Sequence, residues 1–235
     1  MRVLLFGKNS QDLSGHLAKL NLVPVSQNPE VVITYGGDGT LLEAERKFPQ
    51  VPKLPIRHSQ NCHYCASHTQ QMLLEKLKNQ QLNSQKFFKL AAVAGQRRAL
   101  ALNEIGVLHQ LLYQGIRFQV KINRQDVAGT IIGDGVVVAT PFGSSGYFQS
   151  ITGKTFTSGI GVAFSNTVSH LKYRVVDEKS SIEVLIVRGP AQVTNDNNPD
   201  LIQLVEGDKI SITRSPQTAV ILSDSLSCLD CAKTH

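Results

Sequence analysis

The feature that most constrains the fold is the stretch of residues 31–40, in which an apolar, largely β-branched run leads directly into Gly36-Gly37-Asp38-Gly39-Thr40. The run at 31–35 predicts a buried strand. The residues after Thr40 are strong helix formers, and Pro49 ends them. A glycine-rich turn before a helix N-terminus lets backbone N–H groups approach an anion closely. The candidate phosphate-binding residues are therefore Gly36, Gly37, Gly39 and Thr40.

This turn contains one acidic residue, Asp38. A carboxylate would repel a bound phosphate, so its presence indicates a catalytic base or a metal ligand and not an affinity contact. A tight turn with a solvated aspartate is the alternative interpretation. Asp38 is therefore the candidate catalytic residue.

The charge of the chain bears on its partners. The formal net charge of +6 suits an anionic partner, but the basic residues are scattered, and the densest pair is Arg97-Arg98. Without a basic stripe interleaved with aromatic residues, we expect a phosphorylated small molecule and no nucleic acid. Such an excess also serves as solubilising surface charge. No apolar run approaches the roughly 20 residues that span a bilayer, and the N-terminal apolar run is interrupted at Gly7. We expect a cytoplasmic protein without a membrane partner.

The first part of the chain alternates between strand and helix patterns. Strands are predicted at residues 2–6, 31–35 and 53–56. Helices are predicted after the capping residue Ser10, after Thr40, and after the capping residue Thr69. This order predicts an open parallel sheet, in which ligands bind beyond the carboxyl ends of the strands.

From about residue 87 the pattern changes to short β-type runs. Residues 117–122 alternate polar and apolar side chains, as in a half-buried antiparallel strand. We therefore predict an α/β fold, with an N-terminal open parallel (Rossmann-like) α/β domain at residues 1–92 and a C-terminal β-rich domain at residues 93–216. The other predicted strands of the second domain are residues 87–93, 105–108, 136–140, 181–187, 209–213 and 219–222.

A second segment rich in glycine and hydroxyl groups follows a predicted strand, and it runs from Thr140 to Tyr147. Hydroxyl side chains beside glycines, ending in a tyrosine, offer hydrogen-bond donors and a stacking face to a nucleotide. A loop whose hydroxyl groups bond its own backbone is the alternative.

Taken together, these segments resemble the NAD kinase family in order and spacing over residues 1–222. The resemblance implies an NAD kinase-like fold, in which the tail at 217–235 returns to the first domain, and a homo-oligomer, either a dimer or a tetramer. The segments that carry it are Gly36-Gly37-Asp38-Gly39-Thr40-Leu41-Leu42, Leu102-Asn103-Glu104, Asp134-Gly135 and Thr140-Pro141-x-Gly143-Ser144-x-x-Tyr147.

The resemblance also implies an activity. A member of this family phosphorylates the 2′-hydroxyl of the adenosine ribose of NAD, using ATP or polyphosphate with Mg²⁺, and so forms NADP. Asp38 would accept the proton of the hydroxyl and help to hold the phosphates through Mg²⁺. The implied NAD-binding residues are Asn103, Glu104, Asp134, Thr140, Ser145, Gly146, Tyr147 and Ser150.

One segment departs from the family pattern. Members carry Gly-(Ile/Val)-Asn-x-Gly-x-Leu-Gly-Phe-Leu after the first helix, whereas residues 55–66 here read Pro-Ile-Arg-His-Ser-Gln-Asn-Cys-His-Tyr-Cys-Ala. In the family this segment closes over the dinucleotide, so the departure concerns which molecule accepts the phosphoryl group. Two alternatives stay open: a diacylglycerol-type lipid kinase, which shares the glycine turn and the fold, and a nucleotide-binding regulator without catalysis.

The four cysteines form two Cys-x-x-Cys pairs, Cys62/Cys65 and Cys228/Cys231. Pairs at this spacing are a common half-site for structural zinc. The resemblance brings the tail back to the first domain, where the two pairs would meet. Four buried reduced thiols, or a disulfide or redox pair, are the alternatives.

Overall fold

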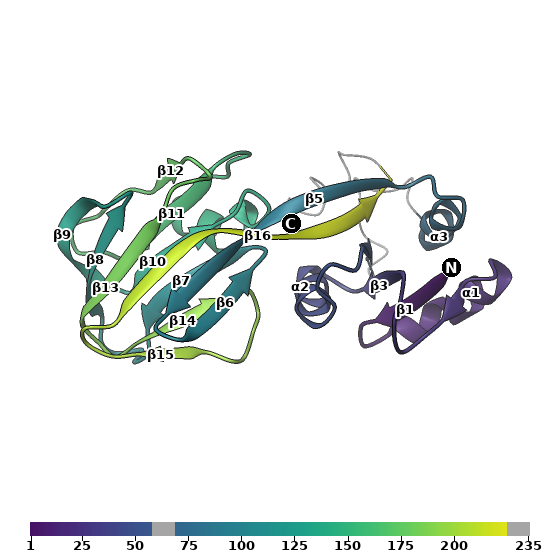
Figure 1. Ribbon diagram of the computed structural model, residues 1–235, viewed down its shortest axis with the longest axis horizontal. Coiled ribbons are helices and arrows are strands. Elements are labelled where there is room, and N and C mark those ends of the chain that lie inside the picture. Colours follow the sequence, from purple (N-terminus) through teal and green to yellow (C-terminus); the bar gives the residue numbers. More distant parts are fainter. Residues whose placement is uncertain (58–68, 225–235) are drawn as a thin grey trace. The chain divides into compact units, whose positions relative to one another are not determined.

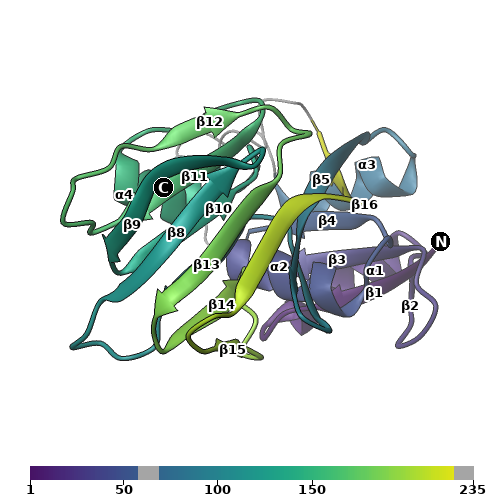
Figure 2. The same cartoon turned by 60° about the vertical axis from the view of Figure 1, so that its left-hand side comes forward.

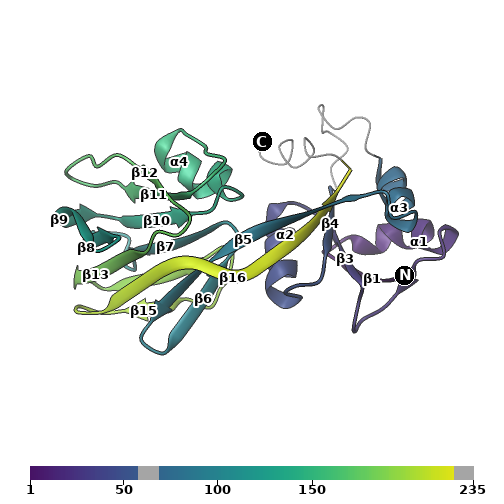
Figure 3. The same ribbon diagram turned by 45° about the horizontal axis from the view of Figure 1, so that its top comes forward.

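The computed structural model describes residues 1–57 and 69–224, which form two compact units. The first unit comprises Met1–Phe87 and the segment that begins at Thr218, and the second is Phe88–Gln217. The predicted boundaries, after residues 92 and 216, fall inside two long strands, β5 (Asn83–Ala94) and β16 (Lys209–Ser223). These strands pair with each other and continue from one unit into the other (Figure 3).

The first unit has a parallel sheet in the order β2-β1-β3-β4-β16. The predicted strands at 2–6, 31–35 and 53–56 are confirmed. The helix predicted after Thr40 is present as α2, which begins two residues earlier, at Asp38. The elements besides β5 and β16 are β1 (Arg2–Phe6), η1 (Ser10–Leu13), α1 (Ser14–Lys19), β2 (Val23–Pro24), β3 (Val31–Tyr35), α2 (Asp38–Lys47), β4 (Lys53–Ile56) and α3 (Gln70–Lys78) (Figure 1).

Helices pack on both faces of this sheet. Ile33 of β3 belongs to one buried cluster with Leu17 of α1 and Leu74 of α3. Val32, the preceding residue of the same strand, belongs to another cluster with Ala44 of α2. Successive side chains of a strand point to opposite faces, so β3 is buried on both sides, which explains its uninterrupted apolar run.

The two predicted helix caps have different outcomes. Thr69 caps α3 as predicted, because its hydroxyl oxygen accepts a hydrogen bond from the Met72 N–H at 3.2 Å. Ser10 does not precede a regular α-helix. It is the first residue of the 3₁₀ turn η1, which α1 follows, and Asn9 occupies the N-cap position without a side-chain capping bond.

The second unit consists of two sheets of antiparallel strands. One has the order β12-β11-β10-β7-β14-β15. The other contains β16, β13, β8 and β9 side by side (Figure 2). Strand β5 pairs with both β6 and β16. The remaining elements are β6 (Arg97–Ala101), β7 (Glu104–His109), β8 (Ile116–Ile122), β9 (Gln125–Gly133), β10 (Gly135–Ala139), η2 (Ser144–Phe148), α4 (Gln149–Thr152), β11 (Ile160–Ser165), β12 (Arg174–Val176), β13 (Ile182–Arg188), β14 (Ala191–Asn195) and β15 (Ile202–Leu204).

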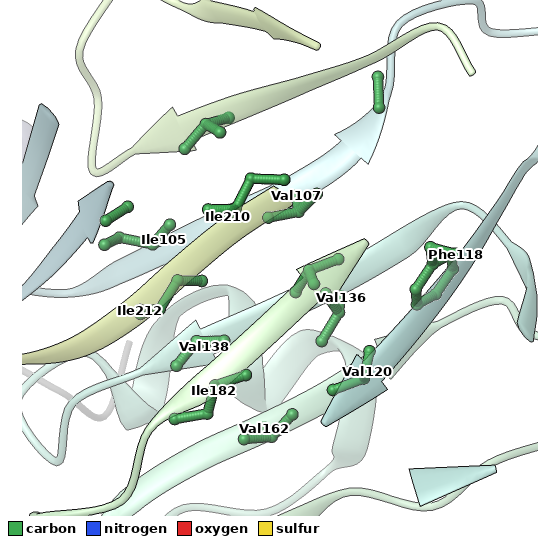
Figure 4. Close-up of a cluster of buried hydrophobic side chains, with 14 of the residues drawn as sticks. Ile105, Val107, Phe118, Val120, Val136, Val138, Val162, Ile182, Ile210 and Ile212 are labelled. Carbon is green, nitrogen blue, oxygen red and sulfur yellow. The ribbon is translucent and has the colours of Figure 1, made fainter. Parts of the chain in front are cut away.

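The inner faces of these two sheets form one core. Val107 and Val136, from β7 and β10, pack in a single buried cluster with Phe118 and Ile182, from β8 and β13 (Figure 4). The predicted α/β fold class, with a parallel sheet and a β-rich portion, is thereby confirmed.

Within residues 1–57 and 69–224, no helix has the length and apolar character to traverse a bilayer.

The strand prediction differs from the structure in two ways: two predicted strands form one, and seven strands within the described residues were not predicted, namely β2, β6, β9, β11, β12, β14 and β15. Residues 209–213 and 219–222, predicted as two strands, belong to the single strand β16. The buried strand β11 was not predicted, because its sequence Ile-Gly-Val-Ala-Phe-Ser has no alternation and contains a glycine.

Candidate active site

In the first unit, the glycine turn lies at the carboxyl end of β3, beside the end of β1. A Cβ at Gly36 would lie 2.3 Å from the Thr40 hydroxyl oxygen, and a Cβ at Gly7 would lie 2.3 Å from the Tyr35 carbonyl oxygen. Both distances are too short for a side chain. Gly7 and Gly36 therefore let two strand ends and the first turn of α2 come together.

The helix α2 begins in this turn, with Gly37 at its N-cap position. Gly37 has an extended backbone with φ −101°, and a Cβ there would meet no atom within 4 Å. Neither Gly36 nor Gly37 has a positive φ. Close packing against Thr40 explains Gly36, and access to the backbone explains Gly37. The Thr40 N–H donates to the Gly37 carbonyl at 3.0 Å and is used inside the helix.

Asp38 is the first residue of α2, and its side chain is exposed. Partial desolvation raises the pKa of the Asp38 carboxyl above its ordinary value, and the positive charge of Arg57 opposes this shift. Arg57 directly follows β4, which pairs in parallel with β3, so both residues lie at the carboxyl edge of the sheet. Arg57 was not predicted as a site residue from the sequence. A cation directly after a strand of a parallel sheet was the available signal.

In the second unit, the structure brings two predicted segments together. The Thr140 N–H donates to the Asn103 carbonyl at 2.8 Å. The Thr140 hydroxyl donates to the Leu102 carbonyl at 2.6 Å and accepts from the Gly143 N–H at 3.1 Å. Gly143 lies directly on Asn103, because a Cβ there would be 2.3 Å from the Asn103 carbonyl oxygen. Thr140 and Gly143 thus join the Asn103-Glu104 pair to the loop that begins at Thr140.

Two side-chain oxygens at this junction are buried without a hydrogen-bond partner in the described part of the chain: Asn103 Oδ1 and Glu104 Oε2. Both side chains approach Gly146, where a Cβ would lie 3.3 Å from Glu104 Oε2 and 3.8 Å from Asn103 Nδ2. An unsatisfied buried polar atom costs about 1–3 kcal/mol. Two such atoms on consecutive residues are what a site completed by a polar ligand would show.

The carboxyl of Glu104 favours its neutral form. Burial raises its pKa to about 8, and the negative charge of Asp196 adds to the shift. At neutral pH the Glu104 carboxyl therefore carries a proton and can donate a hydrogen bond.

Asp196 was not predicted as a site residue from the sequence. It follows β14, and its carboxylate accepts from the N–H groups of Leu102 and Asn103 at 2.8 Å and of Glu104 at 3.2 Å. Burial raises the pKa of Asp196, while those N–H groups and Lys89 oppose the shift. The available signal was the run Asn-Asp-Asn-Asn at 195–198, because such residues accept backbone bonds in turns.

The other residues predicted for the nucleotide lie in and after the irregular helical turn η2. Gly146 interrupts it with a non-helical backbone, and Tyr147 is 42% exposed, so its ring face is accessible. The Ser150 hydroxyl donates to the Tyr147 carbonyl at 2.8 Å. Ser145 is half-buried in the same turn.

Asp134 lies apart from this cluster. It precedes β10, whereas Thr140 follows that strand, so roughly 20 Å of extended chain separates them. Asp134 Oδ2 accepts from Asn166 Nδ2 at 2.6 Å. The structure therefore joins Asn103, Glu104 and the 140–147 loop, and places Asp134 at the opposite end of β10.

The cysteine prediction falls on Cys62, Cys65, Cys228 and Cys231, all of which lie outside the described residues. Within the two described ranges, no three side chains of His, Cys, Asp or Glu converge as a metal site.

Residues 102–223, just over half of the 235 residues, match the profile of the ATP-NAD kinase C-terminal domain. The NAD kinase of Nitrosospira multiformis is 28% identical over 214 residues, covering 86% of this chain and 72% of that protein. The NAD kinase of Saccharolobus solfataricus is 27% identical over 233 residues, covering 94% and 89%.

Two solved structures share the fold. An NAD kinase from Archaeoglobus fulgidus in complex with ATP gives a TM-score of 0.80 at 22% identity, covering 96% of this chain and 94% of that chain. Yeast NADH kinase complexed with NADH gives a TM-score of 0.81 at 14% identity, covering 96% and 84%.

Proposed function

Because this chain belongs to the ATP-NAD kinase family, we infer that it transfers a phosphoryl group from ATP to NAD and so forms NADP. The acceptor is the 2′-hydroxyl of the adenosine ribose. A lipid kinase of the same fold is not favoured, because the match covers the part of the chain that contains Asn103, Glu104 and the 140–147 loop.

One observation in the structure supports this function above the others. Asn103 Oδ1 and Glu104 Oε2 are buried without a partner among the described residues, and Glu104 Oε2 and Asn103 Nδ2 lie near Gly146. An amide and a carboxyl together offer donors and acceptors that match the edge of an adenine ring and the hydroxyl groups of a ribose. A dinucleotide would supply the missing hydrogen bonds.

We propose that the glycine turn of the first unit serves the phosphoryl group. Asp38 accepts the proton of the attacking hydroxyl, which requires its ionised form. The turn of Gly36, Gly37, Gly39 and Thr40 binds phosphate oxygens at the N-terminus of α2. Arg57 supplies positive charge at the same sheet edge, which suits a reaction that depends on positioning and charge neutralisation.

Magnesium fits this turn by its donor chemistry. Mg²⁺ prefers oxygen ligands and is commonly held by one or two carboxylates together with substrate phosphates. Asp38 presents an exposed carboxylate at the carboxyl end of β3. We therefore propose Asp38 as the protein ligand of Mg²⁺. The bound ion would neutralise charge on the transferred group.

For the second unit we propose that Asn103 and Glu104 bind the adenine and the ribose. Ser145, Gly146, Tyr147 and Ser150 line the adenine pocket, and the exposed Tyr147 ring offers a stacking face. Thr140 contributes by holding the two segments together, because its hydroxyl is already used by Leu102 and Gly143.

Asp134 is proposed for the nicotinamide end of the dinucleotide. Its place across β10 from Thr140 is consistent with contact at a different end of an extended ligand. Assembly into a dimer or tetramer, a cytoplasmic location, and a structural zinc at the four cysteines remain further proposals, drawn from the resemblance and the sequence.

The test is incubation of the purified chain with ATP, Mg²⁺ and NAD, with NADP measured by an NADP-specific dehydrogenase. Parallel reactions replace ATP by polyphosphate, NAD by NADH, and NAD by a short-chain diacylglycerol. Formation of NADP from NAD is expected. Binding of NAD and ATP without turnover would favour the regulator, and phosphorylation of the lipid alone would favour the lipid kinase.

A further inference from the structure

We propose that Asp196 is a positioning residue of the NAD site, which holds the backbone at Asn103 and Glu104 in the conformation that receives the nucleotide. This inference rests on the proposed function and adds to it a residue outside the four sequence segments that carry the family resemblance. Asp196 acts through Asn103 and Glu104 and is not itself a contact of the reacting atoms.

The geometry shows how one side chain controls this backbone. The carboxylate of Asp196 accepts hydrogen bonds from three consecutive N–H groups, with Oδ2 on Leu102 at 2.8 Å and Oδ1 on Asn103 at 2.8 Å and Glu104 at 3.2 Å. The Asp196 N–H donates to the Glu104 carbonyl at 3.1 Å. Three donors on one carboxylate leave the segment little freedom to rotate.

The same segment is held by the 140–147 loop. Gly143 leaves no room for a Cβ above the Asn103 backbone, and Thr140 bonds to the carbonyls of Asn103 and Leu102. Asp196 accepts hydrogen bonds from the N–H groups of the segment, and Thr140 donates hydrogen bonds to its carbonyls. The backbone of the segment is therefore hydrogen-bonded within the protein. The side chains of Asn103 and Glu104 keep the unpartnered oxygens.

The charge of Asp196 has a second effect on the site. Its negative charge raises the pKa of Glu104, in addition to burial. Among the described residues, Asp196 is the charged group that acts on Glu104, and Lys89 of β5 acts on Asp196 in turn. Removal of the charge should therefore lower the pKa of Glu104.

The variant that tests this role is Asp196→Asn. Asp196 has a φ of +47°, a conformation that asparagine tolerates well, so the substitution keeps the backbone. It removes the charge and puts an NH₂ group opposite one backbone N–H. The matched control is Asp208→Asn, because the Asp208 carboxylate accepts from the Val205 N–H at 2.8 Å in another turn of the same unit.

The experiment measures the KM for NAD, the KM for ATP, and the dissociation constant of NAD between pH 6 and 9.5. For Asp196→Asn we expect the KM for NAD to rise about tenfold, which corresponds to a lost hydrogen bond to a charged group, while the KM for ATP stays within about twofold. The pH above which NAD affinity falls should move to lower pH. Asp208→Asn should match wild type.

Unchanged NAD affinity and an unchanged pH profile in a folded Asp196→Asn variant would overturn the inference while the kinase function stands. Absence of both NADP formation and NAD binding in the wild-type protein would overturn the proposed function, and this inference with it. If Asp196→Asn does not fold, hydrogen exchange in the wild-type protein tests the inference instead. The amides of Leu102, Asn103 and Glu104 should exchange slowly and slow further with NAD, and rapid exchange in the folded protein would contradict the proposal.

Discussion

Gly143 and Asn103 touch so closely that a Cβ on Gly143 would lie 2.4 Å from the Asn103 Cα. The atoms it would meet belong to the backbone and cannot rotate away. The contact joins two segments that are distant in sequence and that both belong to the family motifs. It accounts for glycine at this position of the chain, although the residue itself offers a ligand no side chain.

The first prediction concerns this contact. Gly143→Ala should lower the free energy of unfolding by about 3 kcal/mol through overpacking, and it should weaken NAD binding because Asn103 must shift. Chemical denaturation and calorimetric titration with NAD measure the two effects. Gly15→Ala is the control, since a Cβ there meets no atom within 4 Å. Equal stability of the two variants would contradict the packing argument.

The second prediction separates packing from access in the glycine turn. Gly36→Ala should destabilise the protein by about 1–3 kcal/mol and reduce turnover, because its Cβ would collide with the Thr40 hydroxyl. Gly37→Ala should change stability by no more than about 0.5 kcal/mol. Adding Thr40→Ala to Gly36→Ala should recover part of the lost stability, and a lack of recovery would show that the collision lies elsewhere.

The third prediction concerns the proposed base. Asp38→Asn should reduce kcat by about 10²–10⁴, the usual contribution of a general base, while leaving the melting temperature near that of wild type. Steady-state NADP formation and thermal denaturation measure both. Glu43→Gln, on the same helix and exposed in an ion pair with Lys47, is the control and should keep its activity. Near-full activity of Asp38→Asn would exclude the proposed role.

The fourth prediction uses the pH dependence of kcat. Asp38 works in its ionised form, so activity is lost as the pH falls through its pKa. Arg57 lowers that pKa, so Arg57→Gln should raise it and move the acid limb of the profile to higher pH. Arg2→Gln is the control, because Arg2 is the first residue of β1 and lies at the amino ends of the parallel strands, away from Asp38. A shift of the acid limb to lower pH would contradict the assignment.

The fifth prediction concerns the proton on Glu104. If the neutral carboxyl binds the nucleotide, the dissociation constant of NAD should rise about tenfold from pH 7 to pH 9, as the neutral fraction falls above the pKa of about 8. Glu104→Gln should bind NAD with little change over this range, since the amide keeps a donor without titrating. Binding that strengthens with pH, together with loss of binding in Glu104→Gln, would mean that the carboxylate is the active form.

Local patterns were sufficient to predict the elements that carry the motifs. The run at Val31–Tyr35 predicts a strand because it is short, apolar and largely β-branched. Thr69 reads as a cap because its hydroxyl reaches a backbone N–H three residues on. Patterns of this kind involve neighbours in the sequence, and such neighbours are the same in any fold. Strand β11 was not predicted because its glycine and its lack of alternation leave no clear local pattern.

The glycine turn, its single acid and the order of the motifs were determined by the sequence alone, since they depend on residue type and spacing. The tertiary structure decided what surrounds them. It put Asp196 against the backbone of Asn103 and Glu104, Gly143 against Asn103, and Arg57 at the sheet edge of Asp38. Hydrogen bonding, desolvation and charge act through space, so the proton on Glu104 and the pKa of Asp38 follow from the distances that only folding creates.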